Sequence, residues 1–67
     1  MLTIKEARIA AHYSMDQMAV YIGVSRPTYG LIEQDPSRMT LGQLKRFCET
    51  AGVRASSLFL PIDLTNV

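Results

Sequence analysis

The side chains that most often carry covalent or metal chemistry are scarce in this sequence. There is one cysteine, Cys48, and one histidine, His12, which are too few for an internal disulfide or a metal site. No nucleophile stands near a base, no carboxylate pair is placed for acid–base work, and no glycine-rich loop is placed to hold phosphate. We therefore predict that the protein is not an enzyme and needs no metal or cofactor.

Three tyrosines offer binding chemistry instead. Tyr13, Tyr21 and Tyr29 could stack on the bases of a single strand. Tyr29, however, falls at a core-facing position of its expected helix, which favours packing over stacking. Cys48 lies on an apolar stripe and is expected in the core, whereas His12 is expected to be exposed near a helix end.

The composition predicts one soluble globular domain over residues 1–67. Hydrophobic residues make up 48% of the chain and charged residues 19%. The net charge of +1 is nearly neutral, so charge alone does not indicate a nucleic-acid partner. The apolar runs are too short to span a membrane, and the N-terminus does not resemble a signal peptide, so we expect a cytoplasmic protein.

Helical spacing of apolar residues predicts an all-α fold, a compact bundle of five short helices. The expected helices cover residues 4–12, 15–22, 26–34, 41–51 and 55–59, and the tail, residues 61–67, is ambiguous. The expected N-terminal caps are Thr3, Ser14, Ser25 and Thr40. Gly23 and Gly52 stand where a left-handed residue ends a helix.

Residues 15–34 carry the pattern of a helix-turn-helix. This motif needs a small residue in its first helix, a glycine in the turn, and apolar residues that fill the wedge between the helices. Ala19 and Gly23 supply the first two features. The wedge residues are Met18, Ile22, Val24, Tyr29 and Ile32. Each feature alone is weak, but their joint spacing predicts the motif.

Residues 19–35, AVYIGVSRPTYGLIEQD, closely resemble the phage repressor and Cro family of helix-turn-helix regulators. The shared features are an alanine, a turn ending Gly-Val-Ser, and a helix ending Ile-Glu. The resemblance extends over roughly residues 3 to 60. It implies a transcriptional regulator that places the helix at 26–34 in the major groove of duplex DNA. Because one recognition helix covers few base pairs, we also predict a homodimer on a near-palindromic operator.

The resemblance implies that four residues at the start of the recognition helix reach base edges: Ser25, Arg26, Pro27 and Thr28. The Arg26 fork can hold the O6 and N7 atoms of guanine. Ser25 and Thr28 can donate hydrogen bonds to phosphate or base, and Pro27 can contact a thymine methyl. Because Pro27 disfavours helical geometry before it, Arg26 could instead sit at the helix cap and project differently.

Other positions depart from the family pattern. Met15 stands where the family has a phosphate-binding glutamine, which leaves Gln17 as a weaker phosphate candidate. Leu31 replaces a polar reader and can make only apolar contacts. Arg38 lies in the following loop. It could contact phosphate or be an ordinary solvated residue, and the sequence favours neither alternative. Three further basic residues are expected to be solvated: Lys45, Arg46 and Arg54.

Two further sets are structural predictions. In line with the family, Arg8 and Glu33 are expected to form a partly buried ion pair that ties the first helix to the third. The apolar residues near the chain end either complete the core or form a dimer interface. The interface is favoured for Leu58, Leu60, Ile62 and Leu64.

Two rival functions stay open. One is an antitoxin of the same fold, which binds a toxin and its own promoter. The other is a protein-interaction module that has lost DNA binding, as Met15, Leu31 and the low net charge would allow. The sequence gives neither the operator nor the direction of regulation.

Overall fold

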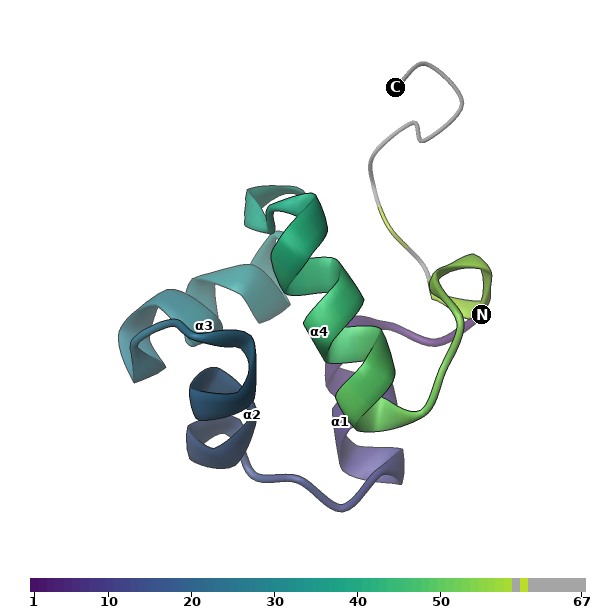
Figure 1. The fold of residues 1–67 in the computed structure, drawn as a ribbon, viewed down its shortest axis with the longest axis horizontal. Helices are drawn as coiled ribbons and strands as arrows, with labels where there is room; N and C mark the ends of the chain where they lie inside the picture. The colour runs from purple at the N-terminus through teal and green to yellow at the C-terminus, as the bar shows by residue number, and fades with distance from the viewer. Residues whose placement is uncertain (59, 61–67) are drawn as a thin grey trace.

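The computed structural model describes residues 1–58 and 60 and has four α-helices over that part of the chain. They are α1 (Ile4–Ala10), α2 (Met15–Ile22), α3 (Arg26–Gln34) and α4 (Leu41–Ala51), with 3-10 turns η1 (Pro36–Arg38) and η2 (Ala55–Ser57). Helix α2 packs against both α3 and α4 (Figure 1). The described residues contain no β-strand, which confirms the all-α class.

Reciprocal hydrogen bonds begin three of the helices. Thr3 and Glu6, Ser14 and Gln17, and Thr40 and Gln43 each form a capping box, in which both side chains bind a free backbone amide of the other residue. These bonds satisfy amides that have no partner inside the helix. The start of each of these helices is therefore determined locally, within four residues of chain.

Left-handed backbone ends three helices. Gly23 and Gly52 follow α2 and α4 with φ of 80° and 71°, as their residue type predicts. His12 does the same after α1 with φ of 64°, although it is not a glycine. Its amide binds Ile9 O and the amide of Tyr13 binds Arg8 O. The helix expected over residues 4–12 therefore ends at Ala10, because His12 turns the chain.

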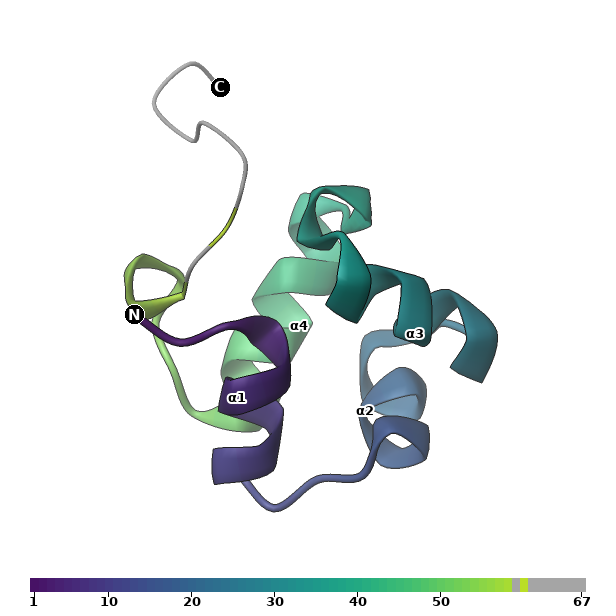
Figure 2. The same ribbon diagram turned by 180° about the vertical axis from the view of Figure 1, so that it is seen from behind.

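The prediction of a fifth helix over residues 55–59 is wrong. Residues 55–57 form only one 3-10 turn, and Leu58 leaves it in extended backbone to form an isolated parallel bridge with Leu2. The amide of Leu2 donates to Ser57 O at 3.0 Å, so the N-terminus lies beside η2 (Figure 2). The loop at 35–39 contains a turn that the sequence did not predict, since Asp35 Oδ1 accepts from both the amide and the hydroxyl of Ser37.

The core gathers one apolar face from every helix. Among the described residues, the buried hydrophobic ones are Ile4, Ala7, Met18, Ala19, Ile22, Tyr29, Ile32, Leu44, Phe47 and Leu58. Tyr29 is 0% exposed, which confirms packing over base stacking for this residue. Leu58 is 2% exposed in the single chain. It completes the core and has no surface left for a dimer contact, which corrects the interface prediction at this position.

The remaining residues of the predicted interface are placed differently. Leu60 is half-buried against the core, and Ile62 and Leu64 lie outside the described residues. No helix in the described part of the chain is long and apolar enough to cross a membrane.

Candidate nucleic-acid interface

Helices α2 and α3 meet through a turn that is closed by backbone hydrogen bonds. The amides of Gly23 and Val24 both donate to Ala19 O at 3.0 Å, and Gly23 also donates to Val20 O. This pattern needs a left-handed residue at Gly23, and it reverses the chain within two residues. Ala19 is 2% exposed, so its small side chain is enclosed where the helices converge.

The recognition helix begins at the residues expected to meet DNA. Ser25 is the N-cap: its hydroxyl oxygen accepts from the amide of Thr28 and its proton goes to Thr28 Oγ1 at 2.9 Å. Arg26 is the first helical residue, so the alternative placement of Arg26 at the cap is wrong. Because Ser25 donates to Thr28, the Thr28 hydroxyl proton is the one left for an external acceptor.

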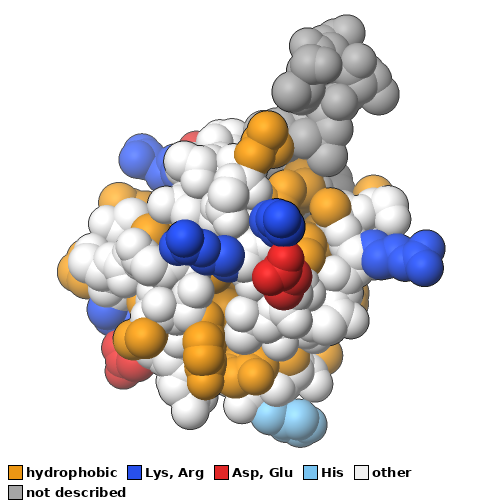
Figure 3. Space-filling view, in the orientation of Figure 1, with side chains coloured by type: hydrophobic (Ala, Val, Ile, Leu, Met, Phe, Trp, Pro, Cys, Tyr) orange, Lys and Arg blue, Asp and Glu red, His pale blue; other side chains and the backbone are white. Residues whose placement is uncertain are grey.

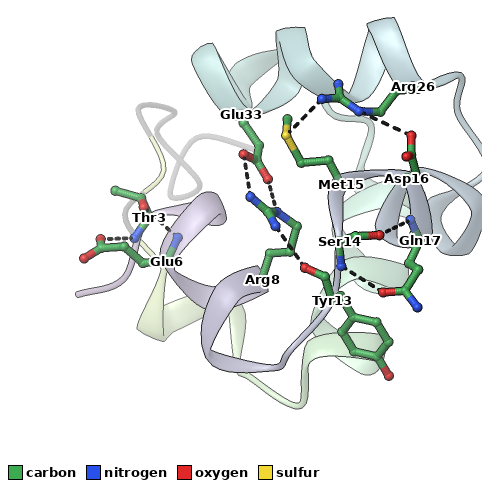
Figure 4. A network of polar contacts seen from close by, with 10 residues as sticks. All are labelled: Thr3, Glu6, Arg8, Tyr13, Ser14, Met15, Asp16, Gln17, Arg26 and Glu33. Atoms are coloured by element: carbon green, nitrogen blue, oxygen red, sulfur yellow. Dashed lines mark hydrogen bonds and ion pairs between the residues drawn. The ribbon is translucent and has the colours of Figure 1, made fainter.

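The Arg26 side chain folds back onto the first turn of α2 (Figure 4). Its Nε lies 3.4 Å from Asp16 Oδ1, and its Nη2 donates to Met15 Sδ at 3.1 Å. Its Nη1 passes close to Gly30, where a Cβ atom would lie 3.2 Å away. The residue predicted to read guanine is therefore engaged within the protein itself.

The other candidate DNA contacts are all exposed. Pro27 and Thr28 stand in the first turn of α3, and Leu31, 44% exposed, stands one turn further on. Gln17 Oε1 accepts from the Ser14 amide and belongs to the cap of α2. Arg38 ends η1, beyond the far end of α3, with its Nε 3.9 Å from Asp35 Oδ2.

On the face that Figure 3 shows, charged side chains do not form one stripe. Figure 3 shows Lys and Arg side chains at separate positions among apolar and uncharged ones on the α4 face. One basic residue was not expected near the motif: Arg46 of α4 lies over the turn, with its Nη1 3.1 Å from where a Cβ of Gly23 would be. Spacing within α2 and α3 gives no signal for it, because the contact depends on how α4 packs.

An ion pair between Arg8 and Glu33 joins α1 to α3. Arg8 Nε lies 2.6 Å from Glu33 Oε2, and the two side chains are only 9% and 7% exposed. Arg8 Nη1 also donates to Tyr13 O at 2.9 Å, in the chain between α1 and α2 (Figure 4). The hydrogen bond to Glu33 raises the pKa of Arg8 above its usual value. One guanidinium therefore contacts the chain just before α2, at Tyr13, and the C-terminal part of α3, at Glu33.

Two further titratable groups have a raised pKa because they are buried or half-buried. Burial and the neighbouring Glu33 carboxylate raise the pKa of Tyr29, whose hydroxyl has no hydrogen-bond partner among the described residues. Burial also raises the pKa of the Cys48 thiol, which is half-buried against the core. A protonated thiol is a poor nucleophile, so Cys48 has a packing role in this setting.

Comparison with known families agrees with this geometry. The family model described as helix-turn-helix, that of the lambda repressor and Cro-like proteins, matches residues 4–58. The chain belongs to this family, whose members are DNA-binding regulators and typically not enzymes. No curated protein and no solved structure matched in the two other comparisons.

Proposed function

We propose that this protein binds duplex DNA in a sequence-specific manner, with α3 in the major groove. The observation that carries the proposal is the N-terminus of α3, where Arg26, Pro27 and Thr28 are exposed at the start of a helix that a hydrogen-bonded turn holds in place. A first-turn arginine can hold guanine through two parallel hydrogen bonds, and the neighbouring hydroxyls can bind phosphate or base.

Selection of bound duplexes from a random library, with the solution mass measured alongside, tests the proposal directly. We expect a short enriched sequence that contains guanine opposite Arg26. Arg26→Ala should then weaken binding to that sequence by about 1–3 kcal/mol, the usual value of one bidentate base contact. If Arg26→Ala binds every selected duplex as tightly as the parent, Arg26 does not read a base.

Phosphate contacts should make the affinity depend on salt. Arg38 is the charged candidate outside the first turn of α3, and each phosphate that such a cation neutralises contributes about 0.9 to the log–log salt slope. Gln17 could donate a hydrogen bond to phosphate but, being uncharged, adds nothing to that slope. We expect binding to weaken steadily between low and physiological salt. A flat dependence would exclude an interface built on phosphate contacts.

We propose that the protein acts as a homodimer. A recognition helix of nine residues is only about 13 Å long and covers few base pairs. Two-fold pairing would place a second helix one turn along the duplex and would double the contacts. A selected sequence with two-fold symmetry, together with twice the chain mass in solution, supports this arrangement. A single half-site bound by a monomer contradicts it.

A protein partner is the second candidate, and a specific surface favours it. An apolar groove of about 480 Å³ lies along α4 and η2 and includes Leu41, Leu44, Cys48 and Val53 in its lining. Leu41 is 61% exposed there. An antitoxin would use such a surface for its toxin, while an interaction module would use it without DNA. Absence of binding to random duplex at low salt would favour the interaction module.

A further inference from the structure

Arg26 is held by three features of two different helices, and they act on different parts of the guanidinium. Asp16 and Met15, in the first turn of α2, engage Nε and Nη2, at 3.4 Å and 3.1 Å. Gly30, one turn further along α3, leaves room for Nη1, because a Cβ atom there would approach to 3.2 Å. The end of the fork that would hold guanine is thus turned toward the protein's own helix.

The same arrangement gives a reason for two unfavourable residue choices. A glycine inside a helix costs up to about 1 kcal/mol relative to alanine, and Gly30 lies in the middle of α3. Met15 offers only a weak sulfur acceptor where the family has a glutamine. Met15 and Gly30 both lie against the folded-back Arg26 side chain. The position of that side chain therefore accounts for both residue choices.

Resting on the proposed function, we propose that Asp16 is a positioning residue for Arg26: its carboxylate holds the guanidinium against α2 in the free protein, and any DNA group that Arg26 binds must displace it. The Asp16 carboxylate lies 3.4 Å from Nε and offsets part of the guanidinium charge, so a phosphate that binds Arg26 must compete with it. A guanine that offers two acceptors in the plane of the fork can replace the contacts that are lost. Asp16 therefore lowers the affinity for any duplex that takes Arg26 from it, by at most the free energy of this exposed pair.

The pair is open to competition because it is exposed. The Arg26 side chain is 46% exposed and that of Asp16 is 82% exposed. Exposed ion pairs are weak, so release of Arg26 should change binding by about two- to fivefold and not by orders of magnitude. The contact biases Arg26 without preventing it from reaching the groove.

The test is a double-mutant cycle on a random-sequence duplex that spans two helical turns, read by fluorescence anisotropy over a range of salt. Asp16→Asn should bind about two- to fivefold tighter than the parent, with a salt slope steeper by about 0.9, the contribution of one more phosphate. In an Arg26→Ala background, Asp16→Asn should change nothing beyond what Glu49→Gln changes. Glu49 is an exposed acid on α4 and is the matched control for loss of one negative charge.

An equal gain from Asp16→Asn with and without Arg26 would overturn the inference, because Asp16 would then act by plain repulsion of phosphate. Binding by the parent together with an unchanged Asp16→Asn affinity would overturn the inference alone. Absence of binding by the parent at low salt would overturn the proposed function and this inference with it.

The Arg26–Asp16 contact can also be tested in the free protein by NMR, independently of its effect on DNA binding. The Arg26 Nε–H signal, identified by its loss in Arg26→Ala, should move toward the position of a free arginine in both Asp16→Asn and Gly30→Ala. Gly30→Ala should keep or raise the melting temperature, since alanine favours the helix. A signal that does not move in either variant would show that Arg26 is not held, and would overturn the inference.

Discussion

Arg8–Glu33 and Arg26–Asp16 are the same pair of chemical groups in two settings. The first pair is 9% and 7% exposed with a 2.6 Å contact, and the second is 46% and 82% exposed with a 3.4 Å contact. In the buried pair, no water can replace a lost partner, so each residue requires the other. In the exposed pair, water or a DNA acceptor can replace Asp16 at little cost. Burial thus separates a structural contact from one that is available for binding.

Loss of Arg8 should have the largest effect on stability. Arg8→Ala leaves the Glu33 carboxylate buried without its partner and also removes the bond to Tyr13 O. We expect the free energy of unfolding to fall by about 3–5 kcal/mol, which is comparable to the whole stability that a core of this size supplies. Urea denaturation followed by circular dichroism measures it. A loss below about 1 kcal/mol would place this pair in the same category as the exposed one.

Tyr29→Phe should have a smaller effect of the opposite sign. The Tyr29 hydroxyl is buried beside the ion pair without a hydrogen bond from or to any described residue. A buried polar group without a partner costs about 1–3 kcal/mol, so its removal should raise the free energy of unfolding by about 1 kcal/mol. Thermal and urea denaturation of the parent and variant give the sign. A clear loss of stability would show that the hydroxyl donates to Glu33 in solution.

Asp16→Asn should change stability least. An exposed pair contributes about 0.2–1 kcal/mol, and dissolved salt screens it. We expect a small decrease in the free energy of unfolding at low salt that disappears at high salt, whereas the effect of Arg8→Ala should persist in both. Parallel denaturation series at two salt concentrations compare the two pairs directly. A large, salt-independent loss of stability in Asp16→Asn would show that the Arg26–Asp16 pair is structural, like Arg8–Glu33.

Local sequence determined the helices and their starts. A capping box needs only two side chains three residues apart, and a glycine at a helix end needs only its own backbone freedom. Residues such as Ser14, Gln17, Gly23 and Gly52 could therefore be interpreted from the sequence without knowledge of the fold. Family resemblance extended this to the helix-turn-helix, which the family match over residues 4–58 bears out.

Where local signals were absent, prediction from the sequence was wrong. His12 adopts φ of 64° without being a glycine, so the end of α1 was placed two residues too late. Residues 55–59 had the composition of a helix, but Leu58 pairs with Leu2 and enters the core. That contact joins the two ends of the described chain, and no pattern within a few residues can report it.

The sequence by itself determined which residue at the start of α3 could bind a base, and the tertiary structure decided what that residue contacts. The spacing of Ala19, Gly23 and Ile32 predicts α3 as the recognition helix, and Arg26 is its one charged first-turn side chain. That Asp16 is its partner follows from the angle at which α2 and α3 meet. Side-chain distances between helices depend on packing across the whole core, and periodicity along one helix carries no information about them.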